Sequence, residues 1–106
     1  MVSEKAWGSI KESDYETPEA FCSACLIDLN KPGSEKAKEL CKLPVYEPSG
    51  ALNRNGVHAA AAALAGARGG VQAPSEVKAK AARALIRLYG KLKEEPPESL
   101  RNLAGA

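Results

Sequence analysis

Apolar residues recur at helical spacing in two stretches of the second half of the chain, residues 53–65 and 74–92. The first stretch places four apolar side chains on one face: Val57, Ala60, Ala61 and Leu64. The second does the same with a longer set: Val77, Ala81, Ala84, Leu85, Leu88 and Leu92. Spacings of three and four residues are typical of amphipathic helices that pack on a core.

Capping and turn residues mark the ends of these two helices. Asn53 can cap the first helix, and Gly66 ends it. Residues 67–70 then form a glycine-rich linker. Pro74 suits the first turn of the second helix, and Ser75 can cap it. The pattern therefore predicts a helical hairpin over residues 53–92.

The first half of the chain is less regular. Thr17-Pro18-Glu19 is a typical helix start, and we expect a helix over residues 17–29. Residues 34–41 are compatible with one or two helical turns. Leu43–Tyr46 predicts a short extended segment, which Pro44 excludes from the centre of a sheet. A last short helix is expected over residues 98–103.

These elements predict a small, mainly α fold in a single domain. A chain of 106 residues can bury one modest core. We expect a flexible N-terminal segment over residues 1–16, in which Trp7 docks on the body, and a helical domain over residues 17–103. The hairpin 53–92, the helix 17–29 and the docked Leu-Pro-Val segment would form its core.

Charge is distributed unevenly around a net value of +2. The first fifty residues carry six Lys and nine Asp or Glu, whereas residues 71–106 carry seven Lys or Arg and four Glu. Four cations share one face of the second hairpin helix: Lys80, Arg83, Arg87 and Lys91. This face is either simply solvated or contacts phosphates, so nucleic-acid binding stays open as an alternative.

Two negative features bear on the compartment. No run of about 18 apolar residues is present, and the first residues lack the apolar centre of a signal peptide. The three cysteines are an odd number, which favours a reducing environment. We therefore expect a cytoplasmic protein that does not bind membranes.

The three cysteines and the single histidine form a candidate metal-binding set, Cys22, Cys25, Cys41 and His58. Two cysteines separated by two residues, with two later ligands, are compatible with a closed tetrahedral zinc site. Buried free thiols are the second interpretation, because such cysteines are often small hydrophobic residues of a core. A disulfide or redox pair between Cys22 and Cys25 is the third.

His58 itself has two interpretations. It can be a residue on the helix flank that bonds a backbone carbonyl or a carboxylate such as Asp28. It can also be the base for a nucleophilic Cys25, since a thiol needs a base to become a thiolate at neutral pH. The sequence shows neither an acidic residue placed to orient the histidine nor an oxyanion loop, so we expect no enzymatic activity.

A longer pattern resembles a known family. It runs through the following residues: Leu43, Pro44, Val45, Asn53, Val57, His58, Ala60, Lys78, Ala81, Leu85, Leu88 and Tyr89. It is similar to a helical module of tailed-phage and prophage proteins, which is appended to, or encoded beside, prohead-protease-like head proteins. Ala24–Asp28 resembles the segment that precedes this module. The resemblance covers most of residues 20–100.

The family has no assigned chemistry and supplies no protease residues, so the resemblance implies a context and not a reaction. That context is phage head morphogenesis, with a head-assembly protein as partner, in the bacterial host cytoplasm or the phage particle. We therefore expect a non-enzymatic interaction or structural module. The alternatives are a nucleic-acid-binding module and a domain stabilised by zinc.

Overall fold

The computed structural model describes residues 2–66 and 70–105. The α-helices in this part of the chain are α1 (Pro18–Ser23), α2 (Arg54–Leu64), α3 (Ser75–Leu92) and α4 (Glu98–Ala104). The strands are β1 (Val2–Ser3), β2 (Cys25–Asp28), β3 (Cys41–Pro44) and β4 (Leu52–Asn53). Three single-turn 3-10 helices complete the described elements: η1 (Trp7–Ser9), η2 (Glu12–Asp14) and η3 (Lys38–Leu40).

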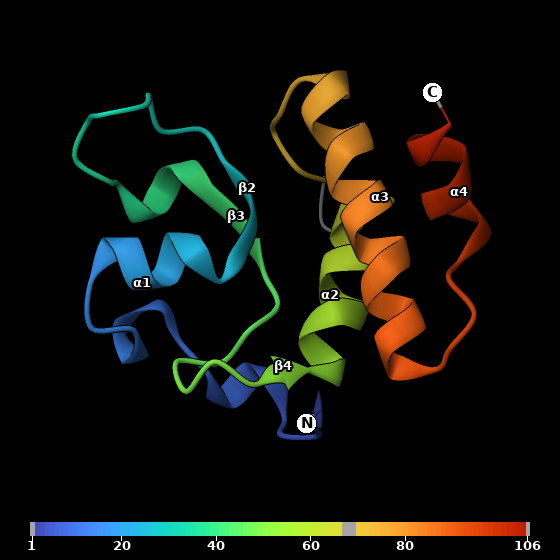
Figure 1. The fold of residues 1–106 in the computed structure, drawn as a ribbon, viewed down its shortest axis with the longest axis horizontal. Coiled ribbons are helices and arrows are strands. Elements are labelled where there is room, and N and C mark those ends of the chain that lie inside the picture. The colour runs from blue at the N-terminus through green and yellow to red at the C-terminus, as the bar shows by residue number, and fades with distance from the viewer. Residues whose placement is uncertain (1, 67–69, 106) are drawn as a thin grey trace.

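Two small sheets make the fold mixed α and β, so the predicted mainly α class is wrong. Strand β2 pairs antiparallel with β3, and β1 pairs parallel with β4 (Figure 1). The helix predicted over residues 17–29 ends at Ser23, and Cys25–Asp28 form strand β2 instead. Ile27 on β2 is fully buried, and pairing with β3 outweighs the helical spacing of its neighbours. The extended segment predicted at residues 43–46 is present, displaced toward the N-terminus as β3.

The hairpin helices lie close to their predicted bounds. Asn53 caps α2, as predicted, and its Oδ1 accepts a hydrogen bond of 2.7 Å from the Gly56 amide. Pro74, and not Ser75, is the residue before α3, and no side chain caps that helix. Helix α3 lies between α2 and α4 (Figure 1). The linker predicted at residues 67–70 falls largely outside the described residues.

The helices within residues 2–66 and 70–105 are all too short or too polar to cross a membrane.

The buried side chains form two adjoining clusters. The larger cluster joins α2, α3, α4, β2 and β3, and its fully buried residues include Val45, Val57, Leu85 and Leu100. The smaller cluster, here called the cysteine core, contains Tyr15, Phe21, Cys22, Ala24 and Cys41. In it the Tyr15 and Phe21 rings meet edge to face with centroids 5.2 Å apart. The fold therefore has an aliphatic helical half and a smaller cysteine-containing half.

The N-terminal segment lies against α2. The Trp7 ring covers Gly56, where a Cβ atom would lie 3.1 Å from three ring carbons. The Asn53 side chain donates a hydrogen bond of 3.1 Å to the Lys5 carbonyl. The expected docking of Trp7 is thus confirmed, and its site is the first turn of α2.

Candidate functional site

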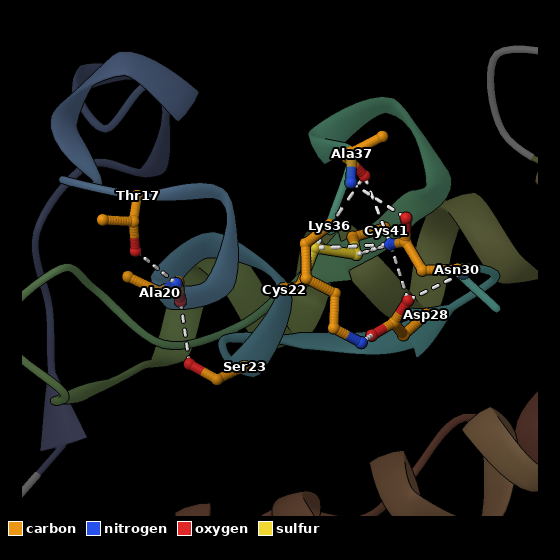
Figure 2. Close-up of a disulfide and its surroundings, with 9 residues drawn as sticks. All are labelled: Thr17, Ala20, Cys22, Ser23, Asp28, Asn30, Lys36, Ala37 and Cys41. Atoms are coloured by element: carbon orange, nitrogen blue, oxygen red, sulfur yellow. Dashed lines mark hydrogen bonds and ion pairs between the residues drawn. A yellow bond between two sulfur atoms is a disulfide. The ribbon is translucent and has the colours of Figure 1, made fainter. Parts of the chain in front are cut away.

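A disulfide joins the end of α1 to the start of β3. It links Cys22 and Cys41, which are 19 positions apart and each about 5% exposed (Figure 2). The interpretation as free thiols is therefore wrong for these two residues, and the Cys22–Cys25 pairing is wrong as well. Cys25 is the free cysteine of the described chain.

Asp28 and Asn30 lie directly beside this disulfide. Asp28 stands opposite Cys41 in the β2–β3 register, so the backbone fixes the two side by side. The Asn30 amide nitrogen donates to Asp28 Oδ1 at 2.8 Å and points at the Cys41 sulfur, 3.3 Å away (Figure 2). Lys36 Nζ lies 2.5 Å from Asp28 Oδ2. The hydrogen bonds from Lys36 and Asn30 lower the pKa of Asp28 to about 2.

Three of the side chains around the disulfide carry atoms that can bind a metal ion. The sulfurs of Cys22 and Cys41 and a carboxylate oxygen of Asp28 all lie within 4.8 Å of one another. Thiolates bind metals, so the set could hold an ion only when the disulfide is open. Cys22 and Cys41 of the predicted metal set are therefore brought together, with Asp28 as a third donor.

The other two predicted ligands, Cys25 and His58, lie outside this cluster. Cys25 is half-buried on β2, opposite Pro44. Burial, together with the charges of Glu12 and Asp28, raises the pKa of the Cys25 thiol to about 12. Cys25 is thus a neutral thiol near pH 7, which is unfavourable for the Cys25–His58 nucleophile pair.

His58 has a carboxylate partner, as one interpretation expected, but that partner is Glu94 and not Asp28. His58 Nε2 lies 2.8 Å from Glu94 Oε1, and its ring stacks on Tyr89 with centroids 5.8 Å apart. Arg54 also binds Glu94, and its Nε lies 2.8 Å from Glu4 Oε2. His58 and Arg54 lower the pKa of Glu94. This charge cluster links the N-terminal segment, α2 and the α3–α4 connection, so its geometry indicates a structural role.

An apolar groove lies between the N-terminal segment, β3 and α2. Its volume is about 580 Å³, and its lining residues are Trp7, Gly8, Leu43, Pro44, Ala59, Ala60, Ala62, Ala63 and Gly70. Ala59 and Ala62 are exposed, so the alanine run presents a smooth surface to solvent. Leu43 at the groove has a positive φ of 62°, which is rare for a residue with this side chain. A second hollow of about 540 Å³ shares Trp7, Leu43 and Pro44 with the groove and extends to Cys41.

The basic face predicted on α3 is exposed. Lys80, Arg83, Arg87 and Lys91 all reach solvent. Arg83 also donates a hydrogen bond of 3.1 Å to the Ala104 carbonyl, so part of this face holds α4 in place.

Sequence reasoning missed the partners of the cysteines and of the histidine. Asp28 and Asn30 come from a segment predicted as helix or turn, and only the β2–β3 register brings Asp28 next to Cys41. Glu94 is 36 positions from His58, and no local spacing indicates that contact.

The chain matches no protein-family model, no curated protein and no solved structure.

Proposed function

We propose that this protein is a non-enzymatic interaction module, which binds an extended apolar segment of another protein in the groove beside Trp7. The observation that carries the proposal is the lining of that groove. It consists of apolar side chains and glycines contributed by the N-terminal segment, β3, α2 and Gly70 of the α2–α3 connection. A small domain that leaves such a concave apolar surface open to solvent has the type of surface that recognises a partner.

The resemblance to tailed-phage modules supports a partner from phage head assembly. The proposed role is therefore in head morphogenesis, in the host cytoplasm or the phage particle. The alanine run suits an extended ligand, because small side chains allow the backbone of a bound segment to approach closely.

Binding can be tested by co-purification with the neighbouring head proteins. Ala59→Glu and Ala62→Glu place charges in the groove, and each should reduce recovery of the partner at least tenfold. Ala20→Glu makes the same change at an exposed position on α1 and should leave recovery unchanged. Equal recovery with all three variants would contradict the groove as the binding site.

A second candidate function is nucleic-acid binding through Lys80, Arg87 and Lys91. Their exposure on one helix supports this alternative. Gel shifts with duplex and single-stranded DNA at about 50 mM salt test it, since phosphate contacts are strong at low salt. The double variant Lys80→Glu, Arg87→Glu should abolish any shift, and absence of a shift with the unaltered protein would exclude this candidate.

Zinc is the third candidate, in a form that differs from the predicted ligand set. Cys22, Asp28 and Cys41 supply three donors, and Cys25 and His58 supply none. Such a site depends on the redox state of Cys22 and Cys41, because thiolates and not a disulfide bind metal.

A further inference from the structure

We propose that Cys22 and Cys41 form a redox-gated metal site. In the reduced protein the two thiolates and the Asp28 carboxylate bind one Zn²⁺ ion, and oxidation to the disulfide excludes it. This inference is independent of the interaction role assigned to the groove.

The β2–β3 register and the packing of α1 bring the three donors together in the structure. Cys41 and Asp28 are register partners on β3 and β2, and Cys22 lies in the last turn of α1, which packs on both strands. Sulfurs bound to zinc at 2.3 Å in a tetrahedron lie about 3.8 Å apart. The donor atoms already lie within 4.8 Å of one another, so in the proposed reduced state the two sulfurs need to separate only a short way once the S–S bond is broken.

Asn30 supplies the hydrogen bonds that such a site needs around its ligands. Its amide nitrogen lies 3.3 Å from the Cys41 sulfur and 3.8 Å from the Cys22 sulfur. An N–H donor aimed at sulfur stabilises the thiolate over the thiol. The same nitrogen binds Asp28 Oδ1, while Asn30 Oδ1 accepts from the Ala37 amide at 2.8 Å. Asn30 is therefore held by the Ala37 amide, and its two N–H hydrogens can serve Asp28 Oδ1 and the nearer sulfur, that of Cys41.

Lys36 opposes the metal. Its ammonium group pairs with Asp28 Oδ2, and the side chains of both residues are about one-third exposed. A cation at the site must share the carboxylate with this charge or displace it to solvent. Removal of the Lys36 charge should therefore strengthen metal binding, an effect that a purely structural ion pair would not give.

The redox step is a thiol–disulfide exchange with a dithiol reductant. The Cys22–Cys41 S–S bond takes two electrons and two protons, and the dithiol is oxidised to its own disulfide. Zinc then displaces the two thiol protons to solvent as both sulfurs coordinate. Three protein ligands leave the fourth tetrahedral position to water. Cys41 lines the 540 Å³ hollow beside Trp7, so we expect the reductant to approach the bond from that side.

Cobalt is the direct probe, because Co²⁺ bound to thiolates gives a charge-transfer band. Protein reduced with a phosphine, and protein with its disulfide verified by mass spectrometry, are each titrated with CoCl₂. We expect the reduced protein to bind one Co²⁺ with a thiolate band, and stoichiometric Zn²⁺ to remove that band. The oxidised protein should show no band.

Variants separate this site from other uses of the cysteines. Asp28→Asn leaves both sulfurs in place and should weaken Co²⁺ binding at least about tenfold. Lys36→Met should tighten binding about threefold. Cys25→Ser should bind as the unaltered protein does, whereas Cys22→Ser should lose the thiolate band.

Three outcomes would overturn the proposal. They are the lack of a Co²⁺ band in the reduced protein, equal bands in the reduced and oxidised proteins, and an affinity unchanged by Asp28→Asn. Loss of the band in Cys25→Ser would show that Cys25 is a metal ligand, together with Cys22, and would also overturn the proposal.

Discussion

Asn53 joins three segments of the chain through a single buried amide. Its Oδ1 accepts from the Gly56 amide and caps α2, while its Nδ2 donates to Glu47 Oε2 at 2.8 Å and to the Lys5 carbonyl. The residue is fully buried, and its hydrogen bonds to Glu47 and to the Gly56 amide are shielded from water. Removal of the amide takes away three hydrogen bonds at once, which costs more than the loss of one surface hydrogen bond.

Asn53→Ala should therefore lower the free energy of unfolding by about 2–3 kcal/mol, the sum of a lost helix cap and a lost hydrogen bond to a buried carboxylate. Urea denaturation followed by circular dichroism measures this loss. Asn55→Ala is the control, because Asn55 also donates to the Lys5 carbonyl but is exposed. We expect it to cost less than 1 kcal/mol. Equal losses would show that Asn53 acts only as an ordinary cap.

Glu47 makes the stability of the protein depend on pH. The Ser3 hydroxyl and the Asn53 amide hold the pKa of this buried carboxyl below its usual range, and Lys5 adds to the effect. A lowered pKa in the folded state means that Glu47 stabilises the fold above the unfolded pKa of about 4.3. That contribution disappears as the pH falls through the lowered value.

Glu47→Gln should thus cost about 1 kcal/mol at pH 7, the difference between a charged and a neutral hydrogen-bond acceptor. The difference in free energy of unfolding between the variant and the unaltered protein should become smaller as the pH falls below about 4. Urea titrations across this range test the prediction, with the exposed Glu35→Gln as control. A difference in unfolding free energy that stays constant with pH would contradict this role of Glu47.

At the scale of the elements, two helical glycines differ in their surroundings. Gly56 in α2 lies beneath the Trp7 ring, whereas Gly90 in α3 has open space around the position of an added Cβ. Glycine is unfavourable inside a helix by about 1 kcal/mol relative to alanine. Only Gly56 has a packing reason to be present, which is the close approach of Trp7.

Gly90→Ala should raise stability by about 0.5–1 kcal/mol and leave Trp7 fluorescence unchanged. Gly56→Ala should give no such gain, because its Cβ requires the indole to move. Since Trp7 is the only tryptophan, acrylamide quenching reports its displacement directly. If Gly56→Ala stabilises the protein with Trp7 still shielded, the ring does not pack as described.

The helical half of the fold could be predicted from the sequence, and the cysteine-containing half could not. The α2 and α3 patterns persist over 11 and 18 residues, and Asn53 supplies a local cap. In contrast, Cys25–Asp28 is only four residues long, a length at which helical and strand spacing cannot be distinguished. This segment is a strand because it pairs with β3, which begins 13 residues later. The residues of the segment itself do not indicate that pairing.

The same reason limits prediction of the site. Cys22 and Cys25 suggest a pair by their spacing, yet the helix ends between them and their side chains belong to different elements. Only the β2–β3 register places Cys41 beside Asp28. Trp7 docking was predictable, because a large apolar side chain in a polar segment needs a surface to cover it.

At the scale of the whole molecule, the disulfide supports the half with the smaller core. The cysteine core holds few large side chains, and two of its members are the bonded cysteines. The aliphatic core around Leu85 and Leu100 contains no cysteine. Loss of the disulfide should therefore loosen one half of the molecule more than the other.

The double variant Cys22→Ala, Cys41→Ala should lower the free energy of unfolding by about 3 kcal/mol, as expected for opening a loop of this length. Hydrogen exchange by mass spectrometry should show lost protection over β2 and β3, while α3 stays protected. Cys25→Ala is the matched control, and because Cys25 is half-buried and unbonded it should cost less than about 1 kcal/mol.

Uniform loss of protection in the double variant would mean that the two halves unfold as one unit.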